Sequence, residues 1–553
     1  SVVRITVPQL VYHAFHRVDN RAEKAILRAL VRGTADLLDC RLDDTMIIDV
    51  AIPNPDAKQF HSFTAQCFAD YVSHRLPSTP MMLEEFDESL TRLGLAWRAG
   101  ASRETESITG VEQCTCFLNT AADAMWQDIR QLLSGLDRRA MLERLLLNGE
   151  ALRRDDRVWK RTARAMLALN ASAGDAHRRM ADQAFKRNAS IVNTRILMEM
   201  ALCECAHEGG LTPGDLDVAR LLSKVSVLTQ IGGWSDGIRH DAITPEVRIS
   251  ALGIIQVDHT FHEGVVMPFG YGFAERQQLR AAEKYDEMCR EAQAVPSTAD
   301  LFEQEFQQAW MAEFGFAIDQ GRRFLDDIED RGRQLEQPVF ALHRSELIGL
   351  RSKELSSDEA TRILDELTLV ARKQWDKPPD SFTMKDVVPW RYRRRLSAVF
   401  RPILQYDVAD DPNCLVVPSF IRDGFVYRLD RTYRAEFDDS QFGSVEMKRW
   451  IGLRRHEAGH QFNHEVGERL RNLGWRCEVE ISPPTLGIDV GDRDYGDVDV
   501  LAWHDQLSRV VVIECKDLMF AKTPGEIARQ LREFRGKYDS HGQPDRLRRH
   551  LDR

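Results

Sequence analysis

The chain has 553 residues, of which 43% are hydrophobic and 29% are charged. This composition is typical of globular proteins and excludes a wholly disordered or fibrous chain. At roughly 100–200 residues per domain, the length predicts several domains. The formal net charge is -11. Any contact with nucleic acid must therefore come from a local basic surface rather than from the charge of the whole chain.

Ten cysteines are scattered along the sequence, far below the density of a disulfide scaffold. No apolar run approaches the roughly 18 residues that a membrane helix needs. The sequence also opens without the charged, apolar and small-residue pattern of a secretory segment. We therefore expect reduced thiols, a cytoplasmic compartment and no membrane partner.

Up to about residue 300 the pattern is mostly helical, with apolar residues recurring every three or four positions. The clearest stripes cover residues 119–136, 161–169, 191–206 and 216–228. Residues 301–376 are again helical, and Ser356 with Glu359 forms a typical helix start. These patterns predict two helical regions, 1–300 and 301–376, of unassigned role.

A small region with strands is predicted over residues 377–443. It opens with a linker at Lys377–Asp380 and carries a basic and aromatic cluster, WRYRRR, at 390–395. The runs Cys414–Ile421 and Gly424–Leu429 are typical of two strands joined by a turn.

From residue 444 the order of elements is helix, three strands, helix. The helical pattern runs from Val445 to Arg471, and the last helix opens at Pro524. The three predicted strands are Trp475–Ser482, Gly496–Trp503 and Arg509–Asp517. The third of these is apolar on both faces, which predicts a central position in the sheet.

Charged residues interrupt two of these strands at informative positions. Asp499 lies among apolar neighbours in the second strand, and Glu514 and Lys516 end the third strand two residues apart. Side chains two residues apart on a strand share one face. Burying them is costly unless they pair or hold a metal. Two carboxylates suit a hard cation such as Mg²⁺, with Mn²⁺ as a substitute, and the amine could orient a water or stabilise charge.

The runs GDVDVLAW and VVVIECKDL resemble the PD-(D/E)xK nuclease superfamily, over about residues 444–553. The resemblance implies a C-terminal α/β restriction-endonuclease-like domain with an αβββα core. It also implies a Mg²⁺ site made by Asp499, Glu514 and the backbone carbonyl of Cys515, with Lys516 acting on water. The glutamate that many members carry on the preceding helix corresponds to Glu465, with Glu468 as the second choice. Val498 stands where the superfamily's name has proline.

The same helix carries a competing motif, HEAGH, at residues 456–460. Two histidines one helical turn apart can bind Zn²⁺, with Glu457 as a general base and Glu465 or Glu468 as a third ligand. This pattern predicts a zinc metallopeptidase as an alternative. His460 or His464 could instead contact phosphate near the nuclease site, or the histidines could simply be solvated.

Nucleic-acid contacts are expected at two places. The C-terminal end, residues 522–553, carries nine basic and five acidic residues, including Lys522 and Arg529. Gln530 resembles a glutamine that nucleases of this superfamily often carry on the following helix. The cluster at 390–395 supplies Arg391, Arg393 and Arg394, although a helix face packed against acidic neighbours would have the same composition.

The sequence thus predicts a multidomain, mainly helical protein with a C-terminal metal-dependent nuclease that cuts phosphodiester bonds, with DNA favoured over RNA. The helical region would select the substrate, regulate cleavage, or bind a second copy or another protein. A third possibility is an inactive nuclease fold that binds nucleic acid or acts as a scaffold.

Overall fold

We analysed a computed structural model of the chain. It describes residues 20–56, 68–169, 176–258, 260, 264, 304–353, 355–391, 393–437, 439–482, 485, 497–516, 523, 525–527 and 530. Contacts divide the chain into two compact units, which are described separately. The smaller comprises residues 1–66 and 262–304, and the larger comprises residues 67–261 and 305–553.

In the smaller unit the structure describes two packed helices, α2 (Arg21–Leu38) and α3 (Asp44–Ala51). The carboxylate of Asp43 accepts a hydrogen bond from the backbone N–H of Met46 at 3.0 Å. This contact caps the first turn of α3, because the first N–H groups of a helix have no partner within the helix.

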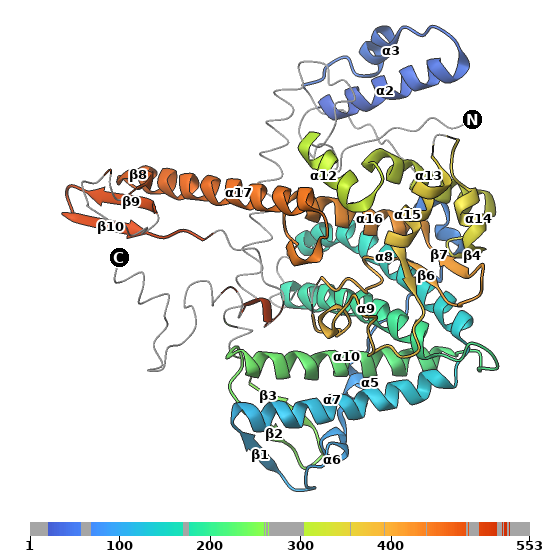
Figure 1. Cartoon of the computed structure of the whole chain (residues 1–553), viewed down its shortest axis with the longest axis vertical. Coiled ribbons are helices and arrows are strands. Elements are labelled where there is room, and N and C mark those ends of the chain that lie inside the picture. Colours follow the sequence, from blue (N-terminus) through green and yellow to red (C-terminus); the bar gives the residue numbers. More distant parts are fainter. Residues whose placement is uncertain are drawn as a thin grey trace. The chain divides into compact units, whose positions relative to one another are not determined.

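Long helices dominate the first part of the larger unit, as the apolar stripes predicted (Figure 1). Packing of α7 against α10 and of α8 against α9 is the most extensive between helices of this unit. These four helices are α7 (Val111–Ser134), α8 (Arg138–Leu169), α9 (Ala176–Glu204) and α10 (Asp215–Arg239). Shorter helical segments precede them, namely α4 (Phe68–Tyr71), η1 (Ser73–Arg75), α5 (Glu85–Arg92) and α6 (Leu95–Arg98).

A three-stranded antiparallel sheet lies within this region, which the sequence predicted to be mostly helical and in which it identified no strands. Its strands are β1 (Glu106–Thr109), β2 (Glu246–Ile249) and β3 (Ile255–Val257), in the order β1-β2-β3. The strands have only three or four residues each, and β1 pairs with a segment about 140 positions away. Such short, distant partners leave little periodic signal in the sequence.

A second sheet joins the two regions that the sequence predicted to be separate. Its order is β4-β7-β6-β5, with strands β4 (Phe340–His343), β5 (Thr368–Val370), β6 (Ile403–Gln405) and β7 (Asn413–Val416). Two strands come from each side of the predicted boundary at residue 377. The four strands therefore form one sheet, and the segment at Lys377–Asp380 is a loop within the larger unit.

The predicted strand at Gly424–Leu429 is wrong, since these residues lie in helix α16 (Pro418–Tyr433). Pro418 occupies the first turn of α16, where its fixed φ and missing N–H favour a helix start. Gly424 lacks the side chain that would approach the carbonyl oxygen of Val399 to 2.6 Å. The glycine thus marks a close helix contact rather than a turn between strands.

The remaining helical segments include α15 (Ser357–Leu367), whose start was predicted correctly. The hydroxyl of Ser356 accepts from the N–H of Glu359, and the carboxylate of Glu359 accepts from the N–H of Ser356. This reciprocal pair is a capping box. The other segments are α12 (Gln304–Phe314), α13 (Ile318–Leu335), α14 (Arg344–Gly349), η3 (Met384–Asp386) and η4 (Asp439–Gln441).

One cluster of buried apolar side chains extends from Leu83 to Val417 and includes the ring contact between Trp126 and Trp375, whose planes are tilted by 53°. We call this part, residues 83–417, the helical body. Because a single core runs across it, the boundaries predicted at residues 300 and 376 do not separate independent cores.

The C-terminal elements are helix α17 (Val445–Asn472) and strands β8 (Arg476–Ile481), β9 (Val498–His504) and β10 (Arg509–Ile513). The strands form an antiparallel sheet in the order β10-β9-β8. We call α17 and this sheet the C-terminal module (Figure 1). The predicted helix and three strands are confirmed, whereas only fragments of the last predicted helix are described, at residues 525–527 and 530.

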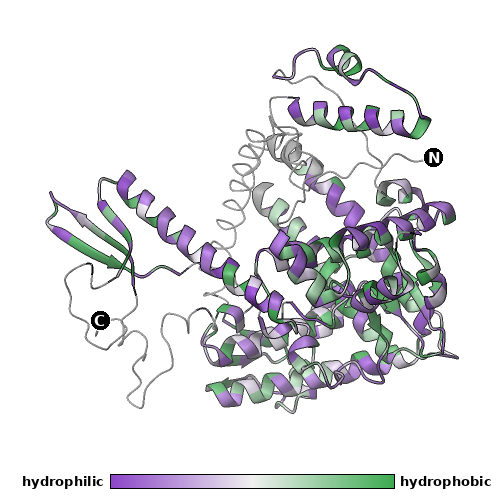
Figure 2. Ribbon diagram, turned by 45° about the horizontal axis from the view of Figure 1, so that its top comes forward, coloured by the Kyte–Doolittle hydropathy of each residue, from purple (hydrophilic) through white to green (hydrophobic). Residues whose placement is uncertain are grey.

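The predicted central position of the third strand is wrong for the described sheet. β9 lies in the middle and β10 at an edge. Figure 2 shows hydrophobic residues along the strands of this sheet. Two of those in β10, Val510 and Val512, are nevertheless 69% and 67% exposed. Continuous hydrophobicity therefore does not mark a central strand here.

No helix among the described residues is both long enough and apolar enough to cross a membrane.

Candidate active site

Helix α17 connects the helical part of the larger unit with the C-terminal sheet. Its first turns are capped by Ser444 and bury Met447, Trp450 and Ile451. Its last turns bury Asn463 and Gly467. A Cβ atom at Gly467 would lie 2.7 Å from a methyl group of Val479, so glycine allows β8 to approach the helix.

The strand register places three acidic residues in one row across the sheet. Val479 pairs with Val500 and Ile481 with Val498, so Glu480 lies opposite Asp499. Ile513 also pairs with Val500, so continuing the register by one residue places Glu514 opposite Asp499 from the other side. Directly opposite residues in an antiparallel pair are near neighbours. The sequence predicted that Asp499 and Glu514 would lie close, but it did not identify Glu480.

Asp499 is held by contacts on both carboxylate oxygens. The backbone N–H of Cys515 donates to Oδ2 at 2.6 Å, and the side-chain amide of Asn463 donates to Oδ1 at 3.3 Å. The residue between Glu514 and Lys516 is thus in direct contact with Asp499, which brings the two parts of the predicted motif together.

Glu514 and Lys516 form an ion pair of 2.7 Å between Oε1 and Nζ. Their side chains are 38% and 34% exposed, so solvent and a ligand can reach them. This ion pair would have to open, at least partly, for Glu514 to coordinate a cation. Among the described residues there is no ready-made group of three or more His, Cys, Asp or Glu side chains suited to a metal ion.

The donor types fit a hard divalent cation. Carboxylate and backbone carbonyl oxygens are the groups that Mg²⁺ prefers, and Mg²⁺ usually keeps several waters beside one or two carboxylates. Asp499, Glu514 and the carbonyl of Cys515 are such groups. The thiol of Cys515 is a poor nucleophile, because burial and the charges of Asp499 and Glu514 raise its pKa to about 11.

Asn463, rather than Glu465, is the side chain of α17 that reaches Asp499. Successive residues of an α-helix are rotated by about 100°, so residues two positions apart differ in direction by about 200°. Glu465 therefore leaves the helix on the side nearly opposite to Asn463. Glu465 accepts a hydrogen bond from Gln461 at 3.2 Å, and Glu468 is exposed. The choice of Glu465 or Glu468 from the sequence is therefore not supported by the contacts around Asp499.

Glu480 adopts an unusual backbone conformation that turns its carboxylate towards α17. Val479 faces α17, where it meets Gly467, and regular alternation would direct the next side chain to the other face. Glu480 instead has φ 58°, in the left-handed region that non-glycine residues rarely occupy. Its carboxylate contacts Nδ1 of His460 and accepts from the amide of Asn463 at 3.2 Å.

The environment of Glu480 favours its ionised form. Partial burial alone would raise its pKa, but the hydrogen bonds with His460 and Asn463 hold the pKa below its ordinary value. Asn463 thereby bridges two carboxylates, Glu480 and Asp499. The feature that distinguishes Glu480 is its unusual φ angle, which cannot be read from the sequence. This residue was therefore not identified from the sequence.

The HEAGH motif belongs to the same network of contacts. Nε2 of His460 lies 2.7 Å from Nε2 of His456, while Nδ1 of His460 contacts Glu480. The two motifs that compete in the sequence are therefore adjacent in space. Glu457, the base that a zinc peptidase would need, is engaged with Arg454 at 2.5 Å.

A protein-family model described as "Anti-phage protein Upx-like" matches residues 2–553. The chain belongs to the Upx-like anti-phage family. No curated protein and no solved structure matches it. Because the match spans almost the whole length, the family model covers both the helical body and the C-terminal module.

The three arginines of the 390–395 cluster that were predicted to contact nucleic acid each lie beside an acidic side chain in this Upx-like chain. Arg394 is only 8% exposed and pairs with Glu199, with its Nη2 3.1 Å from Oε1. A buried guanidinium in a bidentate pair cannot reach a phosphate without unpacking, so this structure does not support the contact predicted for Arg394. Arg391 lies 3.3 Å from the carboxylate of Asp236.

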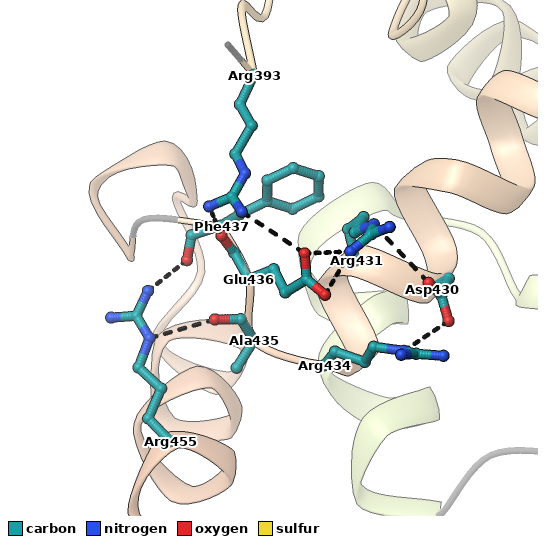
Figure 3. A network of polar contacts seen from close by, with 8 residues as sticks. All are labelled: Arg393, Asp430, Arg431, Arg434, Ala435, Glu436, Phe437 and Arg455. Atoms are coloured by element: carbon teal, nitrogen blue, oxygen red, sulfur yellow. Dashed lines mark hydrogen bonds and ion pairs between the residues drawn. The ribbon is translucent and has the colours of Figure 1, made fainter. Parts of the chain in front are cut away.

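Arg393 also has an acidic partner (Figure 3). Its guanidinium contacts both the carbonyl and the carboxylate of Glu436, which in turn binds Arg431 at 2.5 Å. Arg455 of α17 donates to the carbonyl of Phe437 at 2.6 Å in the same network. Arg393 thus holds the turn after α16, and the described arginines of the cluster have acidic neighbours, although they lie in turns and bends rather than on a helix face.

The other predicted contacts cannot be placed. Lys522 and Arg529 lie outside the described residues, and Gln530 is described only as part of a short helical fragment.

Proposed function

We propose that this Upx-like chain acts in phage defence as a metal-dependent nuclease, with DNA as the favoured substrate. The observation that carries the proposal is the hydrogen bond from the N–H of Cys515 to Asp499, which brings Asp499 beside the segment that carries Glu514 and Lys516. Membership of an anti-phage family is compatible with this activity.

In the proposed site, Asp499, Glu514 and the carbonyl of Cys515 would hold Mg²⁺. The bound ion would lower the pKa of a water and neutralise charge on the phosphate. Asn463 and the N–H of Cys515 fix the orientation of Asp499 through their two hydrogen bonds. Asp499 thus keeps a defined geometry.

Lys516 would act on the attacking water or on the developing phosphate charge. It is held next to Glu514 in the structure, and release from that pair frees its ammonium group for the substrate. A positive charge aimed at the phosphate stabilises the transition state more than the ground state, which is what raises the rate. The helical body would then select the substrate or control when the site is used.

The decisive experiment measures cleavage of single- and double-stranded DNA and of RNA by the full chain, with Mg²⁺, with Mn²⁺ and with a chelator. We expect cleavage that requires the ion, and a loss of at least about 100-fold in Asp499→Asn and in Lys516→Ala. Asp505→Asn is the matched control, since Asp505 lies in the exposed turn after β9 and pairs with Arg476.

Three outcomes would contradict the proposal. One is cleavage that persists in the chelator, and another is wild-type cleavage by both variants. The third is binding of nucleic acid by the folded protein without cutting under any condition, which would indicate the inactive scaffold instead.

A further inference from the structure

The HEAGH histidines are not used in the proposed nuclease mechanism, yet their geometry is specific. His456 and His460 are one turn apart on α17, and their rings are nearly perpendicular, with centroids 4.0 Å apart. The two Nε2 atoms face each other at a distance of 2.7 Å. Because a neutral imidazole has one acceptor nitrogen, two Nε2 atoms that converge can share a proton or share a cation.

The other nitrogen of His460 is held in the way that is usual for metal-binding histidines. Such histidines almost always donate their second ring N–H to a carboxylate or carbonyl, which fixes the ring and increases the basicity of the ligating nitrogen. Nδ1 of His460 contacts Glu480 in this manner. The arrangement leaves Nε2 of His460 as an acceptor towards the position that it shares with His456.

The backbone strain at Glu480 supports a functional reason for this contact. The left-handed region is unfavourable for a non-glycine residue, because its Cβ atom crowds the following carbonyl oxygen. The φ of 58° at Glu480 is what brings its carboxylate to His460 on α17. Strained residues of this kind concentrate at ligand-binding sites, because the surrounding structure must maintain them for a purpose.

The arginines beside the motif do not disturb the site. Arg454 pairs with Glu457 and lies over the ring of Tyr433, 5.4 Å from its centroid. Arg455 donates to the carbonyl of Phe437. Both guanidinium groups therefore have partners away from the two imidazoles.

We propose that His456 and His460 bind one borderline divalent transition metal, represented by Zn²⁺, through their Nε2 atoms, with Glu480 holding His460. Imidazole nitrogen favours such metals, whereas the carboxylates around Asp499 favour Mg²⁺. At Zn–N distances of about 2.0–2.1 Å in a tetrahedral site, the nitrogens would separate to about 3.3 Å, which small side-chain rotations allow. Waters or a ligand oxygen fill the other positions. The site does not depend on the nuclease proposal.

The test is a titration of the metal-free full chain with Zn²⁺ in competition with a coloured chelator. We expect one ion per chain that is bound with a dissociation constant in the micromolar range. His456→Ala and His460→Ala each weaken binding at least about tenfold, and Glu480→Gln weakens it by about tenfold because it removes the charge that holds His460. His456 is exposed, so its replacement leaves the fold intact.

His464→Ala is the matched control, because His464 is on the same helix but outside the pair of converging nitrogens. Both His464→Ala and Asp499→Asn should bind Zn²⁺ like the wild type. If Asp499→Asn loses cleavage and keeps Zn²⁺, the two sites are independent. Binding that His456→Ala and His460→Ala leave unchanged, or no binding by the wild type, would overturn the proposal and indicate a hydrogen bond between the two rings only.

Discussion

The helical body and the C-terminal module use charged residues in opposite ways. In the body, Arg394 and Glu199 are 8% and 1% exposed and satisfy each other deep in the core. In the module, Glu514 and Lys516 are about one-third exposed, and His456, His460 and Glu480 form a chain of contacts near the surface. The same residue types therefore maintain structure in one region and remain accessible to ligands in the other.

This difference shows that a charged motif in the sequence has to be interpreted together with its burial in the structure. The cluster at 390–395 and the ECK triplet that follows β10 both resemble candidates for contact with phosphate or metal. Burial decides between them, because a charge that is desolvated and paired cannot exchange its partner cheaply. A comparison of substitutions in the two regions can test this interpretation.

The largest effect is expected at the buried ion pair of the body. Arg394→Ala leaves the carboxylate of Glu199 buried without its partner, which should lower the free energy of unfolding by about 3–5 kcal/mol. Urea denaturation followed by circular dichroism measures the change. Lys516→Ala, which breaks an exposed pair, should change stability by less than about 1 kcal/mol. Similar losses in both variants would refute the distinction between the regions.

The next largest effect concerns close packing in the body. A Cβ atom at Gly232 of α10 would lie 2.1 Å from the ring of Trp390, which is rigid and cannot move aside easily. Gly232→Ala should therefore destabilise the protein by about 3 kcal/mol, at the upper end of overpacking costs. Its neighbour Gly233 meets nothing within 4 Å. Gly233→Ala should instead be neutral or slightly stabilising in the same denaturation experiment.

Substitutions of two valines test whether β10, the edge strand of the C-terminal module, is part of a hydrophobic core. Val416 of β7 is fully buried, and Val416→Ala removes two methyl groups from the core, at a cost of about 2 kcal/mol. Val512 of β10 is 67% exposed, and Val512→Ala should change the free energy of unfolding by less than about 0.5 kcal/mol. A cost at Val512 as large as at Val416 would show that β10 is covered in solution.

The smallest individual effects are expected along α17 itself. A Cβ atom at Gly467 would lie 2.7 Å from Val479, whereas one at Gly459 would meet nothing within 4 Å. Gly467→Ala should loosen the helix from β8 and cost about 1 kcal/mol. Gly459→Ala should stabilise the helix by about 0.5–1 kcal/mol. Thermal unfolding of the two variants should give melting temperatures that shift in opposite directions.

The sequence by itself determined the elements with strong local signals. The helix at 119–136, the helix start at Ser356, and the order of one helix and three strands after residue 444 follow from apolar periodicity and capping residues, which act over a few positions. The same local reasoning identified Asp499, Glu514 and Lys516 as residues for a common site, although their role in catalysis remains a prediction.

Only the tertiary structure decided which side chains meet. Asn463 rather than Glu465 contacts Asp499, because helix direction and strand register together fix the neighbour. Glu480 joins the site through a left-handed φ angle, and Arg394 leaves the list of nucleic-acid contacts because Glu199, almost 200 positions away, neutralises it in the core. Pairings between distant segments depend on the whole packing, and no local pattern encodes them.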